Sequence, residues 1–377
     1  MQKKVAIGLS GGVDSAVSAH LLKQQGHKIT AVYLECWHTP GCRAEKDRQD
    51  ALQIALQLKI PFKVLDFKKE YQNQVMTYFL EEYKQGRTPN PDILCNSVIK
   101  FGLFYDWAMS NGYDAIATGH YAQIGLDQEK KPVLLTSEDL HKDQTYFLHQ
   151  MKQSQLGQIV FPIGHLKKDE VRTIAEQQKL SVADKKDSVG ICFVGEINVP
   201  EFLKEKLGEN PGEIVTSSGE IIGKHQGLWF YTIGQRKRFT VDTKLIKKNT
   251  NWVVESGDLL PLFVIGKDQK KNQLIIGPKI STFCSQWLIH SLHWIDKEIN
   301  WKNLPLRVKI RHTGKILPCK LNQISNECWK VTTTEPVDGV SPGQFSVFYL
   351  ELEAESNKQT KCFVCLGGGV ISELSSS

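Results

Sequence analysis

The strongest constraint on the fold of this chain is the alternation of strand-like and helix-like segments in its first 118 residues. Short runs rich in β-branched residues occur at residues 4–9, 28–34, 62–66 and 114–118. Helical patterns lie between them at residues 16–25 and 45–58, and a long helical pattern after residue 66 continues through Lys84. This alternation is typical of βαβ units and predicts a parallel sheet. We therefore expect an N-terminal Rossmann-like domain that binds its ligand at the carboxyl ends of the strands.

From residue 211 onward the pattern changes. Helical periodicity fades, and short alternating segments are separated by Gly, Asn and Asp, as at residues 213–215, 220–223, 262–265, 306–310 and 345–350. Such a pattern predicts small, mostly-β, barrel-like domains. With 377 residues the chain is long enough for several cores. We expect a catalytic α/β domain over residues 1–207, a small central β domain over 208–277 and a C-terminal β-barrel domain over 278–377.

The composition, with 41% hydrophobic and 23% charged residues, is that of a globular protein. No apolar run approaches the roughly 20 residues that cross a bilayer, and the N-terminus lacks a secretory apolar region, so we expect a cytoplasmic protein with no membrane partner. Nine scattered cysteines indicate reduced thiols rather than a disulfide framework. The net charge of +6 is too small by itself to indicate a nucleic-acid partner.

A glycine-rich loop, Ser10-Gly-Gly-Val-Asp-Ser15, follows the first predicted strand and leads into a helix. Small residues let backbone N–H groups approach phosphate oxygens, the serines add hydroxyl donors, and the helix N-terminus favours an anion. The loop lacks the lysine of a Gly-Lys-Ser/Thr motif, which argues against a kinase or GTPase. Taken alone, it also fits a plain strand-to-helix turn with a Ser or Asp cap.

The segment over residues 86–100 contains Pro89 and Pro91, followed by Asp92 and Cys95. The prolines predict a stiff, extended turn that delivers Asp92 and Cys95 to the start of a helix. A helix N-terminus lowers the pKa of a thiol, and Asp92 is near enough in sequence to serve as its base, so Cys95 is a candidate nucleophile. The alternative is that Cys95 is a small buried apolar residue.

A second cysteine, Cys192, lies in a segment over residues 185–195 that has flanking glycines and begins with Lys185 and Lys186. Glycines permit close approach of backbone to a substrate, and lysines stabilise a thiolate or an RNA phosphate. The alternative is a buried strand that ends at Gly195.

The loop at residues 10–15 resembles the pyrophosphatase loop of enzymes that split ATP between its α and β phosphates. Together with residues 86–96, 117–121, 142–147 and 186–195, and with 231–237, 341–344 and 365–369, it makes the chain similar, nearly end to end, to the bacterial tRNA-specific 2-thiouridylase family. The resemblance implies ATP-dependent adenylation of the wobble uridine in glutamate, glutamine and lysine tRNAs. The C2 oxygen is then replaced by sulfur, and Asp14 helps to hold Mg²⁺.

The resemblance also implies the roles of individual residues. Cys192 carries the sulfur as a persulfide, Cys95 is its partner thiol and ends in a disulfide with Cys192, and Asp92 is the base. A sulfur-relay protein or a cysteine desulfurase supplies the sulfur. The implied ATP site comprises Gly8, Leu9, Ser10, Gly11, Gly12, Val13, Asp14, Ser15, Leu34 and Gly119. The implied tRNA contacts, including those around the flipped base, are Asn90, Pro91, Asp92, His120, Lys142, Asp143, Gln144, Arg311, His312 and Gln344.

Some interpretations of these residues remain open. His120 also fits a capped histidine at a strand end, and Arg311 and His312 also fit an exposed strand edge. Three segments depart from the family pattern: Leu34 replaces a frequent methionine, residues 37–42 shorten an acidic stretch, and residues 238–243 replace a glycine-rich turn. No metal site is expected, because Cys362 and Cys365 lack a second pair at zinc-ribbon spacing. The remaining cysteines are expected to be packing residues, namely Cys36, Cys42, Cys284, Cys319 and Cys328.

Two rival functions follow from the same motifs. One is another adenylating enzyme of the pyrophosphatase-loop class that acts on a different tRNA position or forms an amide. The other is a protein that binds tRNA and ATP without turnover. The pair Cys95 and Cys192 favours thiolation, because an amide-forming ligase needs neither thiol.

Overall fold

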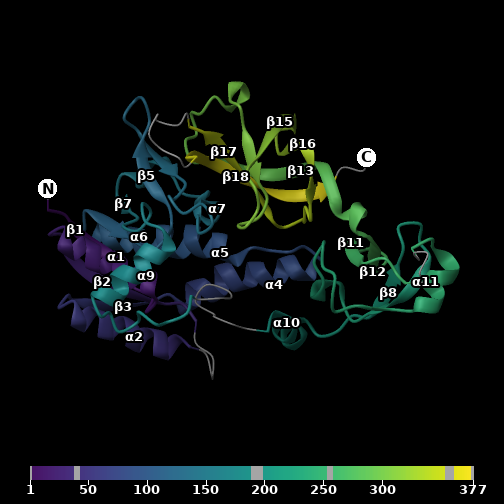
Figure 1. Ribbon diagram of the computed structural model, residues 1–377, viewed down its shortest axis with the longest axis horizontal. Coiled ribbons are helices and arrows are strands. Elements are labelled where there is room, and N and C mark those ends of the chain that lie inside the picture. The colour runs from purple at the N-terminus through teal and green to yellow at the C-terminus, as the bar shows by residue number, and fades with distance from the viewer. Residues whose placement is uncertain (1, 38–42, 188–197, 253–257, 353–360, 375–377) are drawn as a thin grey trace.

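The computed structural model describes residues 2–37, 43–187, 198–252, 258–352 and 361–374. The molecule is elongated, with the N-terminal α/β region at one end, the central β region at the other, and a barrel between them (Figure 1). Across these described residues, no helix is both long and apolar enough to cross a membrane.

The N-terminal sheet is parallel throughout and has the strand order β3-β2-β1-β4-β7. Its strands are β1 (Lys4–Gly8), β2 (Lys28–Glu35), β3 (Phe62–Asp66), β4 (Ala115–Ala117) and β7 (Ile159–Val160). Val5, Ala6 and Ile7 of β1 are fully buried, as expected for a central strand that is covered on both faces. The predicted parallel sheet is therefore confirmed.

Helices cover both faces of this sheet. One core cluster joins β1 to α1 (Val13–Gln24), α2 (Ala44–Gln57) and α9 (Lys168–Gln177). The other core cluster joins β2 to two long helical runs. The first run comprises α3 (Lys68–Glu70), η1 (Tyr71–Met76) and α4 (Thr77–Lys84), and the second comprises α5 (Pro91–Leu94), η2 (Cys95–Phe104) and α6 (Tyr105–Ser110). Three short helices complete the region, namely α7 (Thr145–Leu148), α8 (Gln153–Leu156) and α10 (Val199–Leu207).

The central region is a sheet with the order β10-β9-β8-β12-β11. It contains β8 (Gly212–Val215), β9 (Ile221–His225), η3 (Leu228–Phe230), β10 (Thr240–Val241), α11 (Thr243–Asn249), β11 (Leu262–Asp268) and β12 (Gln273–Pro278). Its small core includes Ile214, Ile222, Ile246, Val264 and Ile276. The segment at residues 238–243, which departs from the family pattern, forms β10 and leads into α11.

The C-terminal region is a closed barrel. Its strands are β13 (Phe283–Trp294), β14 (Arg307–Lys309), β15 (Leu317–Ser325), β16 (Cys328–Asp338), β17 (Phe345–Glu351) and β18 (Phe363–Leu374), with η4 (Lys279–Thr282) and η5 (Trp301–Asn303) as short helical turns. Pairing of β13 with both β16 and β18 closes the barrel. The predicted fold class, an α/β domain followed by β-rich domains, is confirmed.

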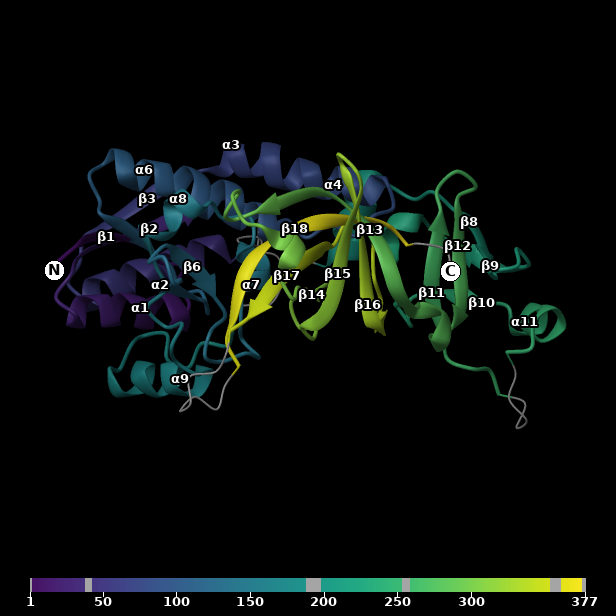
Figure 2. The same ribbon diagram turned by 90° about the horizontal axis from the view of Figure 1, so that it is seen from above.

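One hairpin crosses the expected domain division. Strands β5 (Gln123–Leu126) and β6 (Pro132–Leu135) come from the N-terminal part of the sequence, yet β6 pairs with β18 of the barrel through Leu135 and Val364. Seen from above, the hairpin lies beside β18 (Figure 2). A hairpin from the N-terminal part of the sequence thus extends the sheet of the barrel, while the parallel sheet of the α/β region remains separate.

Candidate active site

The loop between β1 and α1 has the conformation of an anion cradle. Ser15 Oγ donates to the Gly12 carbonyl at 3.0 Å and accepts from the Ser10 backbone N–H at 3.2 Å. Gly12 is the N-cap of α1, in an extended conformation. The loop is therefore held open at the N-terminus of a twelve-residue helix, where backbone N–H groups and the helix dipole favour a phosphate.

Two glycines let other segments pack directly against this loop. Gly11 has a φ of +76°, and a Cβ there would lie 2.4 Å from the Asp47 carbonyl oxygen. A Cβ on Gly119, which follows β4, would lie 2.6 Å from the Ser15 backbone nitrogen. The predicted ATP-site residues Gly8, Leu9, Gly11, Val13 and Gly119 therefore lie around one strand-to-helix junction. Leu34 lies at the carboxyl end of the adjacent strand β2 and is 5% exposed.

Asp14 is engaged by two donors. Lys168 Nζ donates to Asp14 Oδ1 at 2.7 Å, and the Tyr121 hydroxyl donates to the same oxygen at 2.9 Å. Lys168 is only 8% exposed, so its ammonium group lies in a partly desolvated position. Burial and the Asp14 carboxylate raise the pKa of Tyr121 far above its usual value, which keeps the hydroxyl a donor. The sequence prediction included Asp14 but missed Lys168.

Asp187 forms ion pairs with three basic side chains next to this loop. Lys142 Nζ lies 2.8 Å from Asp187 Oδ2, and Lys168 Nζ and Arg172 Nη2 lie 2.9 and 2.6 Å from Asp187 Oδ1. Burial raises the pKa of Asp187, but hydrogen bonds from Lys142 and Lys168 outweigh burial and lower it to about 2. Asp187 is thus ionised at neutral pH and ties the chain just before residue 188 to the nucleotide loop. Cys192 itself lies outside the described residues.

Asp92 and Cys95 lie on one helical run that begins with Pro91 at its first turn. Asp92 is in that first turn, and Cys95 follows one turn later at the start of η2. Residues three apart in a helix are neighbours on one face, so the two side chains share a face. Cys95 is fully buried, in the same core cluster as Leu34 and Tyr146. The extended turn was predicted, but the cysteine lies one turn deeper in the helix than expected.

The extended turn before this helix is packed against the barrel. Gln344 Nε2 donates to the Thr88 and Pro89 carbonyls at 2.8 and 3.2 Å, and Asn90 Nδ2 lies 3.5 Å from Gln344 Oε1. Of the residues predicted to surround the target uridine, Asn90 therefore contacts Gln344, and Pro91 and Asp92 follow it directly in the chain. The sequence motifs predicted both segments but not their contact.

Two residues predicted to contact tRNA are buried inside the protein. His120 is 7% exposed, and its ring nitrogens lie 2.7 Å from Thr118 Oγ1 and 3.3 Å from Lys100 Nζ. Asp143 is 1% exposed and accepts from Ser137, Thr145 and, at 3.5 Å, the barrel residue Lys309. Both side chains are satisfied by intramolecular partners. Their contact with tRNA stays a prediction, and the geometry favours a structural role for each.

The other predicted tRNA contacts lie on surfaces nearby. Gln144 Oε1 accepts from the Tyr121 backbone N–H at 2.9 Å, directly beside the Asp14 cluster. Arg311 is exposed, and His312 packs on Phe147 with ring centroids 4.6 Å apart. Burial, together with Lys309 and Lys142, lowers the pKa of His312 to about 4, so its imidazole is neutral at physiological pH. Arg311 is accessible to a phosphate, whereas His312 offers a neutral aromatic surface.

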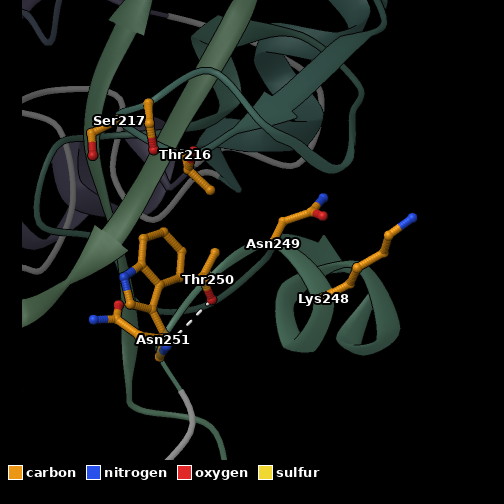
Figure 3. Close-up of a pocket in the computed structure, with 8 residues that line it drawn as sticks. Thr216, Ser217, Lys248, Asn249, Thr250 and Asn251 are labelled. Atoms are coloured by element: carbon orange, nitrogen blue, oxygen red, sulfur yellow. Dashed lines mark hydrogen bonds between the residues drawn. The ribbon is translucent and has the colours of Figure 1, made fainter.

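An open pocket of about 460 Å³ lies elsewhere, in the central region between the β8–β9 turn and the end of α11 (Figure 3). It is lined by hydroxyl and amide side chains, one lysine and one tryptophan, namely Thr216, Ser217, Ser218, Lys248, Asn249, Thr250, Asn251 and Trp252. No residue predicted for the ATP or cysteine site lines it. This pocket is therefore separate from the candidate active site.

Comparisons with known proteins cover nearly the whole chain. The family models described as "tRNA methyl transferase HUP domain", "tRNA methyl transferase PRC-barrel domain" and "Aminomethyltransferase beta-barrel domain" match residues 3–196, 200–278 and 285–371. The solved structure of a 4-thiouridine synthetase–RNA complex with bound ATP is 18% identical, covers 54% of this chain and 50% of that chain, and has a TM-score of 0.35.

Full-length relatives are much more similar. The tRNA-specific 2-thiouridylase MnmA of Staphylococcus aureus (strain bovine RF122 / ET3-1) is 40% identical over 380 residues, which cover 98% of this chain and 95% of the relative. The protein of the same name from strain Newman has the same identity and coverage. An identity of this size over both chains leaves no major region unmatched. The chain belongs to the tRNA-specific 2-thiouridylase family.

Proposed function

We propose that this protein is an ATP-dependent tRNA 2-thiouridylase that replaces the C2 oxygen of the wobble uridine with sulfur. The observation that carries the proposal is the 40% identity, over 98% of the chain, to relatives with that name. The geometry adds an anion cradle and a cysteine-bearing helix within one α/β region. A pyrophosphate-binding loop suits adenylation, whereas methyl transfer, which the names of two family models suggest, needs no such loop.

The first step is adenylation of the uridine C2 oxygen, because a uracil carbonyl oxygen is a poor leaving group. The oxygen attacks the α-phosphorus of ATP, and pyrophosphate leaves. Backbone N–H groups of the loop at residues 10–15 and the Lys168 ammonium stabilise the charge on the phosphates. The Asp14 carboxylate is the kind of hard oxygen ligand that Mg²⁺ takes together with phosphates. Bound there, Mg²⁺ would neutralise part of the triphosphate charge.

The second step is sulfur transfer. The terminal sulfur of a Cys192 persulfide attacks C2, and AMP leaves with the former C2 oxygen. The Cys95 thiolate then attacks the Cys192 sulfur, which releases 2-thiouridine and leaves a Cys95–Cys192 disulfide. Asp92, on the same helical face as Cys95, accepts the Cys95 proton. Two electrons from an external thiol reset the pair.

The partners follow from this chemistry. The substrate is tRNA, and we propose the tRNAs for glutamate, glutamine and lysine as the specific set. The sulfur comes from a sulfur-relay protein or a cysteine desulfurase. Because the pair must be reduced after each turnover, we place the enzyme in the reducing cytoplasm.

A thiolation assay tests the proposal directly. Unmodified glutamate tRNA is incubated with ATP, Mg²⁺, cysteine, a cysteine desulfurase that forms the persulfide on Cys192, and a reducing thiol. The product 2-thiouridine is measured by mass spectrometry for wild type, Cys95→Ser and Cys192→Ser. Cys328→Ser, which changes a barrel cysteine remote from the helix of Cys95, is the matched control. We expect product with wild type and the control, and none with either of the other variants.

The opposite outcomes are equally informative. Full activity of Cys95→Ser would remove Cys95 from the mechanism. ATP and tRNA binding without 2-thiouridine from wild type, even with a cysteine desulfurase as donor, would leave a binding protein without turnover. Product at another uridine would indicate a different member of the adenylating class.

A further inference from the structure

Residues 86–90, which connect α4 to the helix of Asp92 and Cys95, form the meeting point of the three regions of the protein. In Figure 1, α4 runs beneath the barrel toward β11 and β12, and the chain then returns to α5. The returning segment, Gly-Arg-Thr-Pro-Asn, contains a proline and precedes another, so it cannot satisfy its backbone groups by forming a helix. Its polar backbone groups must find partners elsewhere.

The central region provides the first of these partners. Lys267 on β11 donates from Nζ to the Gly86 carbonyl at 2.9 Å. Gly86 has a φ of +69°, and a Cβ there would lie 1.9 Å from Gln269 Nε2, so the turn after β11 packs directly on this glycine. Lys267 is partly buried, and burial lowers its pKa to about 7. The end of α4 is thus fixed by a residue from the central sheet.

The barrel provides the partners of Thr88 and Pro89, whereas the Gly86 and Arg87 backbone N–H groups donate to the Tyr83 and Glu82 carbonyls of α4. The Thr88 backbone N–H donates to the Pro342 carbonyl at 2.8 Å. The side-chain amide of Gln344 donates to the Thr88 carbonyl at 2.8 Å and to the Pro89 carbonyl at 3.2 Å. Gly343 has a φ of +89°, and a Cβ there would lie 2.9 Å from the Thr88 nitrogen. The loop over residues 341–344 and the extended segment are therefore in close contact along their backbones.

The hydrogen-bonding capacity of Gln344 is used inside the protein. A carboxamide has two N–H donors and one carbonyl acceptor. Both donors point to backbone carbonyls of the extended segment, and Oε1 lies 3.5 Å from both Asn90 Nδ2 and the Tyr146 hydroxyl. If Gln344 donated to tRNA, it would have to give up a carbonyl of the extended segment.

From these contacts we infer that Lys267 and Gln344 are positioning residues, which act through residues 86–90 to place Asp92 and Cys95 for thiolation. The inference rests on the proposed function and gives Gln344 a role in supporting the catalytic segment. The two β regions are then part of the catalytic apparatus, in addition to any surface that they offer to tRNA. Misplacing a reacting group by about 1 Å costs on the order of 100-fold in rate, so removal of these hydrogen bonds should be visible in kinetics.

The test separates positioning from tRNA binding. Gln344→Leu and Lys267→Met are compared with wild type in single-turnover thiolation at saturating tRNA, and the Kd for tRNA is measured separately. We expect the rate to fall by about 10- to 100-fold, with less than about a threefold change in Kd. Lys267→Arg, which keeps a donor for the Gly86 carbonyl, should recover most of the rate. Gln323→Leu and Lys320→Met, at exposed barrel positions, are the matched controls.

A second readout does not depend on turnover. Cys95 is fully buried, so its alkylation by iodoacetamide without tRNA, followed by peptide mass spectrometry, reports release of the segment. We expect Gln344→Leu and Lys267→Met to alkylate Cys95 several-fold faster than wild type, because each variant removes hydrogen bonds that hold the segment in place. Cys365 in the barrel, 2% exposed, serves as the internal reference.

The alternatives give different results. A raised Kd with an unchanged saturating rate would identify Gln344 as a tRNA contact and overturn the inference. Unchanged rates and unchanged alkylation in both variants would also overturn it. If wild type itself makes no 2-thiouridine, the proposed function fails, while the alkylation measurement still decides whether the contacts hold the segment.

Discussion

Lys168 Nζ lies 2.7 Å from Asp14 Oδ1, which joins the first turn of α9 to the first turn of α1 beside the anion cradle. The pair is partly buried, with side-chain exposures of 10% for Lys168 and 32% for Asp14. The same ammonium group also contacts Asp187. Lys168 is therefore a cation held directly beside the loop, and it is already desolvated before a phosphate arrives.

We predict that Lys168→Met weakens the use of ATP. Loss of a charge-assisted hydrogen bond to a phosphate costs about 1.5–3 kcal/mol, so kcat/KM for ATP should fall by about 10- to 100-fold. The measurement is thiolation rate against ATP concentration at saturating tRNA. Lys167→Met is the control, because Lys167 is the exposed N-cap of the same helix. Equal losses in the two variants would contradict a specific role for Lys168.

Gly119 provides a steric test of the same site. A Cβ at this position would lie 2.6 Å from the Ser15 nitrogen and 2.8 Å from the Asp14 carbonyl carbon, so Gly119→Ala must displace the loop or the segment after β4. We expect ATP binding, measured by calorimetry, to weaken by at least about tenfold and stability to fall by about 1–3 kcal/mol.

The matched control for Gly119 is Gly157→Ala. A Cβ at Gly157 meets only Pro132 Cγ at 3.7 Å, which is an ordinary contact, and the glycine has right-handed helical dihedrals. This variant should bind ATP like wild type. Normal ATP binding by Gly119→Ala would show that the loop at residues 10–15 tolerates the displacement.

Much of the fold follows from local sequence pattern. The buried run Val5–Ile7 predicts a central parallel strand, and the glycine-rich loop after it predicts the cradle, because both depend on residues adjacent in the chain. The role of Lys168 depends on how α9 packs against α1, which no local pattern encodes. The same holds for the hairpin of β5 and β6, whose partner β18 is far along the sequence.

Local sequence pattern also does not predict which polar side chains are buried. His120 and Asp143 belong to motifs that the family resemblance assigns to tRNA, yet each is enclosed by a partner distant in sequence, Lys100 and Lys309 respectively. A histidine or aspartate is exposed or buried according to such partners. The motif therefore predicts where these residues lie along the chain, but not which way their side chains face.

Asp187 gives a prediction for stability. Its pKa in the folded protein, about 2, lies below the ordinary value of 3.8, so its stabilisation is present above about pH 4 and is lost as the pH falls through 2. Asp187→Asn should lower the free energy of unfolding at neutral pH by about 1 kcal/mol, a value reduced for the one-third exposure of the side chain.

Urea unfolding at about pH 7 and about pH 3 measures this difference, which should be smaller at the lower pH. Asp184→Asn is the control, since Asp184 is exposed and precedes the same segment. A stability difference for Asp187→Asn that does not change with pH would show that the effect comes from packing rather than from charge.

A cluster of cations on the central region flanks the segment at residues 238–243, which departs from the family pattern. Six exposed basic residues lie between residues 236 and 248, namely Arg236, Lys237, Arg238, Lys244, Lys247 and Lys248. Within the described part of the chain, none of the six forms an ion pair. The intervening Asp242 is occupied in capping α11, where it accepts from the Lys244 and Leu245 backbone N–H groups at 2.8 and 3.3 Å.

We predict that this basic surface binds tRNA phosphates. Replacing Lys244, Lys247 and Lys248 with alanine should weaken tRNA binding at low salt by about tenfold or more, and should reduce the slope of log K against log salt by about one for each phosphate that is no longer neutralised. The rate at saturating tRNA should not change, because α11 lies at the opposite end of the molecule from β1 and α1 (Figure 1). The control replaces Lys59, Lys63 and Lys69, exposed on the α/β region, with alanine. An unchanged salt slope in the α11 variant would mean that its lysines are only solvated.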